Sequence, residues 1–238
     1  MINPETLKPF RPEVQEAIQD FTETLQTFQV GKRAITIGGS TGKGIFDANS
    51  DLDFRIFHER ELLWPDKDPE PWRPVWAKVA KWKERGINID GVRPRSIGEI
   101  DEALRRAIDG QVEVDPKVWS VWGYHLLTDI DNQFIIEDPV GIIAGWHELL
   151  HPFPPKLKEA LLKKHLESLR YWRADYHYRN KVQRGDPVFL AALSARLVHD
   201  IMQVLFAINE RYFPGDGANL VFAQKFEIKP ENLEDRLT

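Results

Sequence analysis

Two aspartates in a short, strand-like segment are the residues of this sequence best suited to do chemistry. Asp51 and Asp53 alternate with apolar residues, so a strand here points both carboxylates to one side and the apolar side chains to the other. Carboxylates that share a face repel each other unless a cation neutralises them. Oxygen ligands favour a hard cation, most simply Mg²⁺. The segment therefore predicts a magnesium site at Asp51 and Asp53.

A glycine-rich turn precedes the aspartates. The segment Arg33–Ile37 is rich in β-branched residues and runs directly into Gly38–Ser40, which predicts a strand followed by a tight turn. Glycines in such a turn let backbone amides and hydroxyl groups approach phosphate oxygens that bulkier side chains would shield. Gly39 and Ser40 are therefore the candidate phosphate-binding residues. The alternative interpretation is a glycine-rich hairpin that carries an exposed acidic strand.

The turn and the aspartates together resemble the signature of the polymerase-beta-like nucleotidyltransferase superfamily. The resemblance implies that Gly39 and Ser40 hold the phosphates of ATP, and that Asp51 and Asp53 bind two Mg²⁺ ions. Two such ions, about 3.5–4 Å apart, can stabilise both the attacking and the leaving oxygen of an in-line displacement at phosphorus. The family pattern also asks for a third acidic residue, which acts as a base or as a further metal ligand.

Two residues compete for this third acidic position. Asp90 lies in the short strand-like run Ile87–Val92, after a helix expected over 71–85, and is the preferred candidate. Glu113 has the same local alternation and remains the alternative. A turn that starts at Asp90, before Gly91, is the purely structural interpretation.

The composition bounds the class of protein. The chain has 238 residues, of which 42% are hydrophobic, enough for one large core or two smaller ones. It contains no cysteine, which excludes disulfides and cysteine-based zinc sites. No uninterrupted apolar run approaches the roughly 18 residues of a membrane span, and we expect a soluble, cytoplasmic protein without a membrane partner. The net charge of −5 argues against a surface built to hold long nucleic acid.

The elements that must position these residues fall into two groups. In the first group we expect helices over 12–30, 71–85 and 97–108, and strands over 33–37, 51–56, 87–92 and 133–136. The segment 61–74, rich in proline and tryptophan, is expected to be a surface loop. Beyond the prolines at 152–155 the pattern is entirely helical, with Asp186 as the N-cap of a long helix that begins at Pro187.

These groups predict an α+β protein of two domains. A mixed sheet flanked by helices forms a nucleotidyltransferase catalytic domain over 1–150, and a helical bundle forms an acceptor-binding domain over 151–238. Only the residues from about Lys229 onward are expected to be loosely held.

The later part of the chain extends the resemblance. The runs 135–139 and 206–216 are similar to bacterial nucleotidyltransferases that modify small molecules, such as aminoglycoside or lincosamide antibiotics. This similarity implies transfer of AMP from ATP to a hydroxyl of a small-molecule acceptor, with release of pyrophosphate. The alternative is a nucleotide-binding or a protein- or RNA-AMPylating, antitoxin-like relative. A homodimer that completes the acceptor cleft is a further hypothesis.

One further motif supports a different class of enzyme. His147, Glu148 and His151 match H-E-x-x-H, in which two histidines one helical turn apart bind zinc and the glutamate acts as the base. Pro152 ends the helix directly after the motif, and no G-x-x-H follows to supply a third ligand. A zinc metallopeptidase is therefore the distant alternative.

Overall fold

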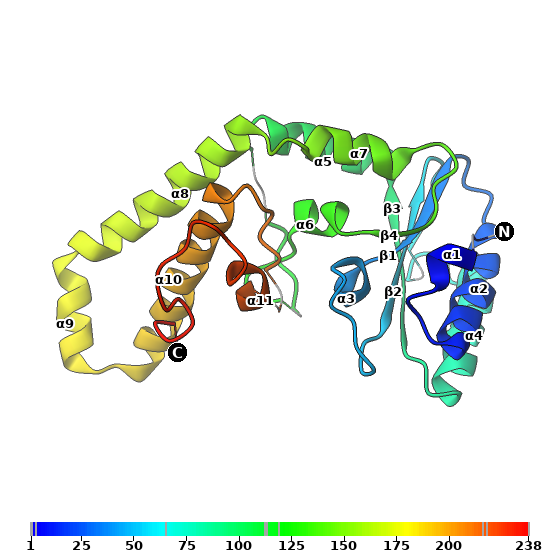
Figure 1. Ribbon diagram of the computed structural model, residues 1–238, viewed down its shortest axis with the longest axis horizontal. Coiled ribbons are helices and arrows are strands. Elements are labelled where there is room, and N and C mark those ends of the chain that lie inside the picture. Colours follow the sequence, from blue (N-terminus) through cyan, green and yellow to red (C-terminus); the bar gives the residue numbers. More distant parts are fainter. Residues whose placement is uncertain are drawn as a thin grey trace. The chain divides into compact units, whose positions relative to one another are not determined.

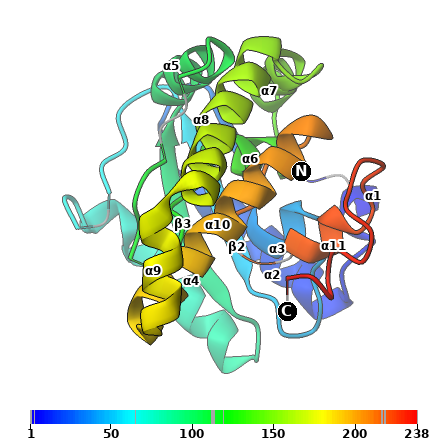
Figure 2. The ribbon, with the colours of Figure 1, turned by 90° about the vertical axis from the view of Figure 1, so that its left-hand side faces the viewer.

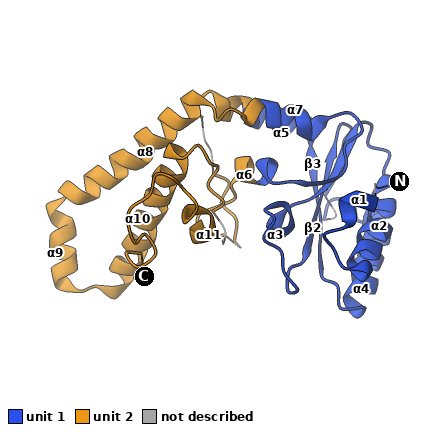
Figure 3. Cartoon of the chain, in the orientation of Figure 1, with its two compact units in different colours: residues 1–104, 129–148 blue, residues 105–128, 149–238 orange. Residues whose placement is uncertain are grey.

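The computed structural model describes residues 2, 4–64, 66–111, 114–118, 120–215, 217 and 219–237. The fold is mixed α+β, as predicted, with a four-stranded sheet, flanking helices and a C-terminal helical region (Figure 1). The chain divides into two compact units, residues 1–104 with 129–148 and residues 105–128 with 149–238 (Figure 3). The second unit thus resumes close to the expected boundary at residue 150, and it also includes 105–128, which the sequence had assigned to the first domain.

The sheet of the first unit has the strand order β3-β2-β1-β4. Its strands are β1 (Arg33–Ile37), β2 (Leu52–His58), β3 (Ile89–Ser96) and β4 (Phe134–Glu137). β1 pairs antiparallel with both β2 and β4, and β3 runs parallel to β2 at the edge of the sheet. The glycine turn and Asp51 therefore lie in the connection between the two central strands, and Asp53 lies at the start of the second.

Seven helices and one 3₁₀ turn accompany the sheet along the described part of the chain. They are α1 (Pro4–Leu7), α2 (Pro12–Gln26), α3 (Gly39–Gly42), η1 (Glu70–Trp72), α4 (Arg73–Glu84), α5 (Ile97–Ile108), α6 (Leu126–Asp131) and α7 (Ile142–Leu150). The last three helices cross from one compact unit to the other. α2 and α4 cover one face of the sheet (Figure 1), where Phe21 packs on Phe54 with ring centroids 4.6 Å apart.

The opposite face of β2 is also covered for most of its length. Arg55 and Phe57, which share the side of Asp53, are both buried. Phe57 contacts Trp146 of α7, with ring centroids 5.0 Å apart. The simple division into a core face and a carboxylate face is therefore wrong beyond the start of β2, because α7 packs against the sheet there.

The second unit is built around two helices that lie side by side, α8 (Pro155–Ala174) and α10 (Pro187–Ile208), as Figure 2 shows. α9 (Tyr176–Arg184) connects them, and α11 (Asn219–Ala223) follows later. α10 begins as predicted, because the carboxylate of Asp186 accepts hydrogen bonds from the backbone N–H groups of Val188 and Phe189.

α10 is the one helix within the described residues that is long and apolar enough to cross a membrane. A single helix of this kind is weak evidence for a membrane span, since core helices of soluble proteins have the same composition. α10 also carries His199 and Asp200, and Asp200 is hydrogen-bonded to α8. The predicted soluble, cytoplasmic location stays a prediction.

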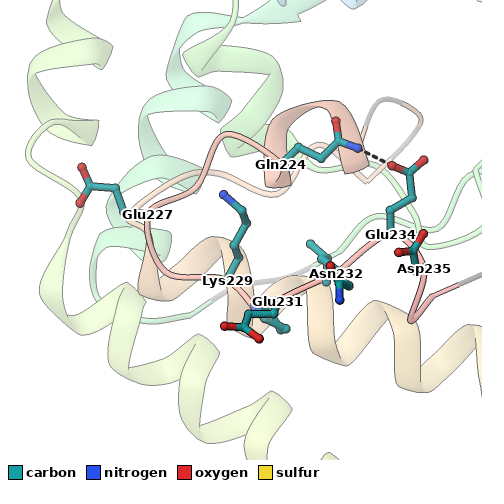
Figure 4. A pocket seen from close by; sticks show the side chains of 9 residues that line it. Gln224, Glu227, Lys229, Glu231, Asn232, Glu234 and Asp235 are labelled. Atoms are coloured by element: carbon teal, nitrogen blue, oxygen red, sulfur yellow. Dashed lines mark hydrogen bonds between the residues drawn. The ribbon is translucent and has the colours of Figure 1, made fainter.

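The C-terminal segment is held in place, contrary to expectation. Leu233 is 6% exposed and belongs to a buried cluster with Met202 and Phe206 of α10, and Leu237 packs against the same cluster. The segment also lines an open pocket of about 470 Å³ (Figure 4). The described residues that line this pocket all lie between Gln224 and Asp235, so it is formed within one stretch of chain.

Candidate active site

The structure brings together the three aspartates that the sequence singled out. Asp51 directly precedes β2, Asp53 is on β2 and Asp90 is on the neighbouring strand β3. One carboxylate oxygen from each lies within 4.8 Å of the other two. Three hard oxygen donors at this spacing fit a magnesium site. The competing candidate, Glu113, lies outside the described residues.

A bulge between β2 and β3 determines where the third carboxylate lies. Leu52 pairs with Ile89, but Phe54 pairs with Val92, so β3 has one more residue than β2 over this stretch. The backbone at Gly91 has a φ of +90°, a conformation that glycine adopts without strain. Because of the extra residue, Ile89 and Val92 are both buried although they lie three positions apart. The carboxylate of Asp90, directly before Gly91, is exposed.

The glycine turn packs directly against Asp53. The backbone N–H of Gly38 donates to the carbonyl oxygen of Asp53 at 2.9 Å. Gly39 has a φ of +57°, and a Cβ atom at this position would lie 1.9 Å from Oδ2 of Asp53. Only glycine therefore lets the turn approach the carboxylate this closely. Ser40 follows in the single turn of α3 and is half-buried.

A buried ion pair supports the turn from the other side. Nε and Nη2 of Arg55 donate to the two carboxylate oxygens of Asp129, each at 3.4 Å. The Arg55 side chain is 9% exposed and that of Asp129 is 10% exposed. Nη1 of Arg55 also donates to the carbonyl oxygen of Asp53 at 3.0 Å. A Cβ atom on Gly38 would lie 2.9 Å from Nη2 of Arg55, so a larger residue here would displace the buried guanidinium.

Sequence reasoning missed the ion pair. Asp129 lies 74 residues from Arg55 along the chain, and no local pattern marks it. The sequence did contain one sign of a buried ion pair. Arg55 is a charged residue between two apolar residues of the strand, Phe54 and Ile56. Such a residue requires a buried partner of opposite charge, although the sequence does not say which residue that is.

The electrostatics of the site are unfavourable to ionised Asp53. Burial raises the pKa of its carboxyl group, and the carboxylates of Asp51, Asp90 and Asp129 raise it further, while Arg55 offsets part of the effect. Ionised Asp53 is therefore destabilised in the folded chain. A divalent cation among the aspartates would relieve that repulsion.

A cavity of about 250 Å³ lies beside the aspartates. Its lining residues come from β2, β3, α4 and the loop before η1, and they are Asp53, Phe54, Arg55, Trp64, Trp76, Asp90, Gly91, Val92 and Arg93. Trp64 is 48% exposed and Trp76 is 44% exposed. Two large aromatic side chains left partly open around a polar cavity are typical of a ligand-binding surface.

The H-E-x-x-H motif does not form a metal cluster among the described residues. Two groups of three potential metal ligands occur there, the three aspartates and a group of His165, His199 and Asp200, and neither includes His147 or His151. α7 ends at Leu150, before the second histidine of the motif. Nε2 of His147 lies 3.1 Å from the carbonyl oxygen of Ile130, a contact that occupies this nitrogen.

The fold and the site thus define an α+β protein with a carboxylate cluster where its strands β2 and β3 pair. A family model described as a domain of unknown function (DUF4037) matches residues 119–216. The match covers less than half of the chain and begins after the glycine turn and the three aspartates, although it includes Asp129 and helices α8 to α10. No curated protein matches the chain significantly.

Proposed function

We propose that the protein is a magnesium-dependent nucleotidyltransferase that transfers AMP from ATP to a hydroxyl of a small-molecule acceptor and releases pyrophosphate. One observation carries the proposal, namely the meeting of three carboxylates with a glycine turn that packs against Asp53. The resemblance of this segment to polymerase-beta-like nucleotidyltransferases supports the same function. The reaction class also agrees with the net acidity of the chain, which disfavours nucleic acid as the acceptor.

Each residue of the site has a role in this proposal. Asp51 and Asp53 would hold two Mg²⁺ ions, which when bound supply positive charge to the phosphoryl group in the transition state. Gly39 and Ser40 would contact the phosphates of ATP through backbone N–H groups and a hydroxyl. Asp90 would accept the proton of the acceptor hydroxyl as its oxygen attacks the α-phosphorus. The bond from the α-phosphorus to the bridging oxygen then breaks, and pyrophosphate leaves.

The cavity beside the aspartates is the proposed acceptor site. Asp90 lines it, so a hydroxyl bound there reaches the proposed base. Its volume, about 250 Å³, is below the roughly 300–1,000 Å³ typical of pockets for drug-sized ligands, which suits one ring of an acceptor. Trp64 and Trp76 offer faces on which such a ring, or a cationic group attached to it, would stack.

Isothermal titration with a non-hydrolysable ATP analogue, with and without Mg²⁺, tests the proposal. We expect binding that requires Mg²⁺ and that is lost in Asp51→Asn/Asp53→Asn. The control is Asp109→Asn, which removes an exposed carboxylate of the second unit and should bind like the wild type. Binding that survives the double substitution, or a wild type that binds no nucleotide, would refute the site. Pyrophosphate release then identifies acceptors, and nucleotide binding without any turnover would favour a non-enzymatic relative.

A further inference from the structure

A second cluster of potential metal ligands lies in the helical unit. Its residues are distant in sequence from those of the proposed nucleotide site. His165 of α8 meets His199 and Asp200 of α10, and one ligand atom from each lies within 4.8 Å of the other two. The two helices lie side by side (Figure 2). His165 is 4% exposed and Asp200 is 5% exposed, and His199 is half-buried.

Hydrogen bonds hold these side chains in a defined orientation. Nδ1 of His165 lies 2.6 Å from Oδ1 of Asp200, and the hydroxyl of Ser168 donates to Oδ2 of Asp200 at 2.6 Å. Nε2 of Gln203 lies 3.2 Å from Nε2 of His199. These contacts fix the orientation of the rings and of the carboxylate, and an ion bound to Asp200 would take the place of one of its hydrogen bonds.

The same contacts argue against a nucleophilic triad. In a Ser-His-Asp triad the serine hydroxyl must bond to the histidine that will take its proton. Here the hydroxyl of Ser168 donates to Asp200 instead. The cluster therefore lacks the hydrogen bond that would activate a serine.

The surroundings of the cluster suit a cation. The ring of Trp122 stacks on His199 with centroids 5.4 Å apart, and the ring of Phe213 lies 5.5 Å away from it. The carboxylate of Asp200 is buried and is hydrogen-bonded to His165 and Ser168, and a bound cation would add the opposite charge that a buried carboxylate favours.

We infer that His165, His199 and Asp200 bind a transition-metal ion of the Zn²⁺ type, which joins α8 to α10. Two imidazole nitrogens and one carboxylate oxygen select such an ion over Mg²⁺, which prefers oxygen ligands and water. Three protein ligands leave a position for a fourth donor. His125, whose ring centroid lies 6.2 Å from that of His199, is a further imidazole beside His199.

Titration of the chelator-treated full chain with Co²⁺, followed by displacement with Zn²⁺, tests the site. We expect one Co²⁺ per chain with visible d–d absorption, loss of that absorption on adding Zn²⁺, and a higher Tm in Zn²⁺. His199→Gln should weaken binding at least about tenfold. His177→Gln, which changes an exposed histidine of α9, is the matched control and should bind as tightly as the wild type.

Two further variants separate this site from the others in the chain. Asp51→Asn/Asp53→Asn and His147→Gln should both retain the Co²⁺ absorption. Its loss in the first would assign the ion to the aspartates, and its loss in the second would assign it to the H-E-x-x-H motif; either result overturns the inference.

X-ray absorption of the zinc-loaded wild type needs no variant and covers the case in which His199→Gln does not fold. We expect two imidazole ligands in the zinc shell. A shell without imidazole, or a wild type that binds neither ion, would overturn the inference.

Discussion

The two proposed metal sites are built from the chain in different ways. Asp51 and Asp53 are almost adjacent in sequence, and only Asp90 comes from another strand. The second cluster joins His165 to Asp200, 35 residues away, on two helices. Asp53 and Asp90 line a cavity, whereas His165 and Asp200 are buried and His199 contacts the rings of Trp122 and Phe213. An open cluster of oxygen ligands suits an ion that meets a substrate, and a buried cluster with nitrogen ligands suits an ion that is retained.

The two clusters should also differ in how they affect the stability of the folded chain. In the first unit the carboxylates repel one another, so the site is destabilising until a cation binds. In the second unit His165, Ser168 and Asp200 are joined by hydrogen bonds, so the cluster stabilises its helices even without an ion. Removal of a charge should therefore have opposite effects on the stability of the two units.

The largest expected effect is on turnover in Asp53→Asn. We expect pyrophosphate release to fall about 10⁴-fold, the scale that follows removal of an essential catalytic carboxylate. Because the pKa of Asp53 is raised in the folded chain, its ionised form destabilises that chain near pH 7. Without Mg²⁺, the variant should thus be as stable as the wild type or more stable, by up to ~1 kcal/mol. Pyrophosphate release measures the activity, and urea denaturation measures the stability. If Asp53→Asn is stably folded and fully active, the mechanism is wrong.

The next effect is on the stability of the first unit in Arg55→Met. This substitution leaves the buried carboxylate of Asp129 without its guanidinium partner, so we expect a loss of about 3–5 kcal/mol in the free energy of unfolding. The double variant Arg55→Met/Asp129→Asn should recover part of the loss, because the buried charge at position 129 is then removed as well. Urea denaturation of the three proteins measures this coupling, and equal losses in the single and double variants would contradict it.

A pair of glycine substitutions tests the contact between the turn and Asp53. Gly39 and Gly44 both have positive φ angles, so alanine at either costs about 1–2 kcal/mol in backbone strain. A Cβ at Gly39 would also collide with Asp53, whereas nothing lies within 4 Å of one at Gly44. Displacement of a catalytic group by about 1 Å can cost about 100-fold in rate. We expect this loss of rate in Gly39→Ala but not in Gly44→Ala. Equal activities in the two variants would show that the turn does not contribute to the site.

The loss of metal binding at low pH gives a test with a smaller expected effect. A protonated Asp53 cannot bind Mg²⁺, and its pKa is raised, so magnesium-dependent nucleotide binding should weaken as the pH falls through that raised value. The midpoint should lie above the value of ~3.9 for an unperturbed aspartate. Titration of the ATP analogue at a series of pH values measures the midpoint. A midpoint at or below the ordinary value would contradict the raised pKa.

The smallest expected effect concerns the acceptor cavity. Trp64→Ala removes an aromatic face worth about 0.5–1.5 kcal/mol, so KM for the acceptor should rise up to about tenfold while kcat stays unchanged. Leu63→Ala is the matched control, because Leu63 is also exposed in this loop but does not line the cavity. A similar rise in KM for both variants would place the acceptor elsewhere.

Local patterns in the sequence predicted the framework well. β1 and α5 occupy the residues that their periodicity indicated, and Asp186 caps α10 through the expected backbone contacts. Alternation along β2 and the glycine turn marked Asp51 and Asp53, and the strand-like run before Gly91 marked Asp90. Each of these features depends on neighbours within a few residues, which is the range over which periodicity and turn chemistry act.

Features that depend on distant residues could not be predicted in the same way. The partner of Arg55, the cover that α7 provides for Phe57, and the cluster of His165 with Asp200 all join separate parts of the chain. The C-terminal segment has a polar composition, and its order comes from a few apolar contacts such as that of Leu233. Tertiary packing decides these positions, and it leaves little trace in a short window of sequence.

The most direct test of the central claim is Mn²⁺ binding, followed by electron paramagnetic resonance, in the presence of the non-hydrolysable ATP analogue. Mn²⁺ replaces Mg²⁺ at oxygen-rich sites, so the signal reports the ion that meets the nucleotide. We predict a nucleotide-dependent bound signal in the wild type and in His199→Gln, and its loss in Asp53→Asn. A signal that persists in Asp53→Asn, or that disappears in His199→Gln, would contradict the assignment of the nucleotide site to the aspartates.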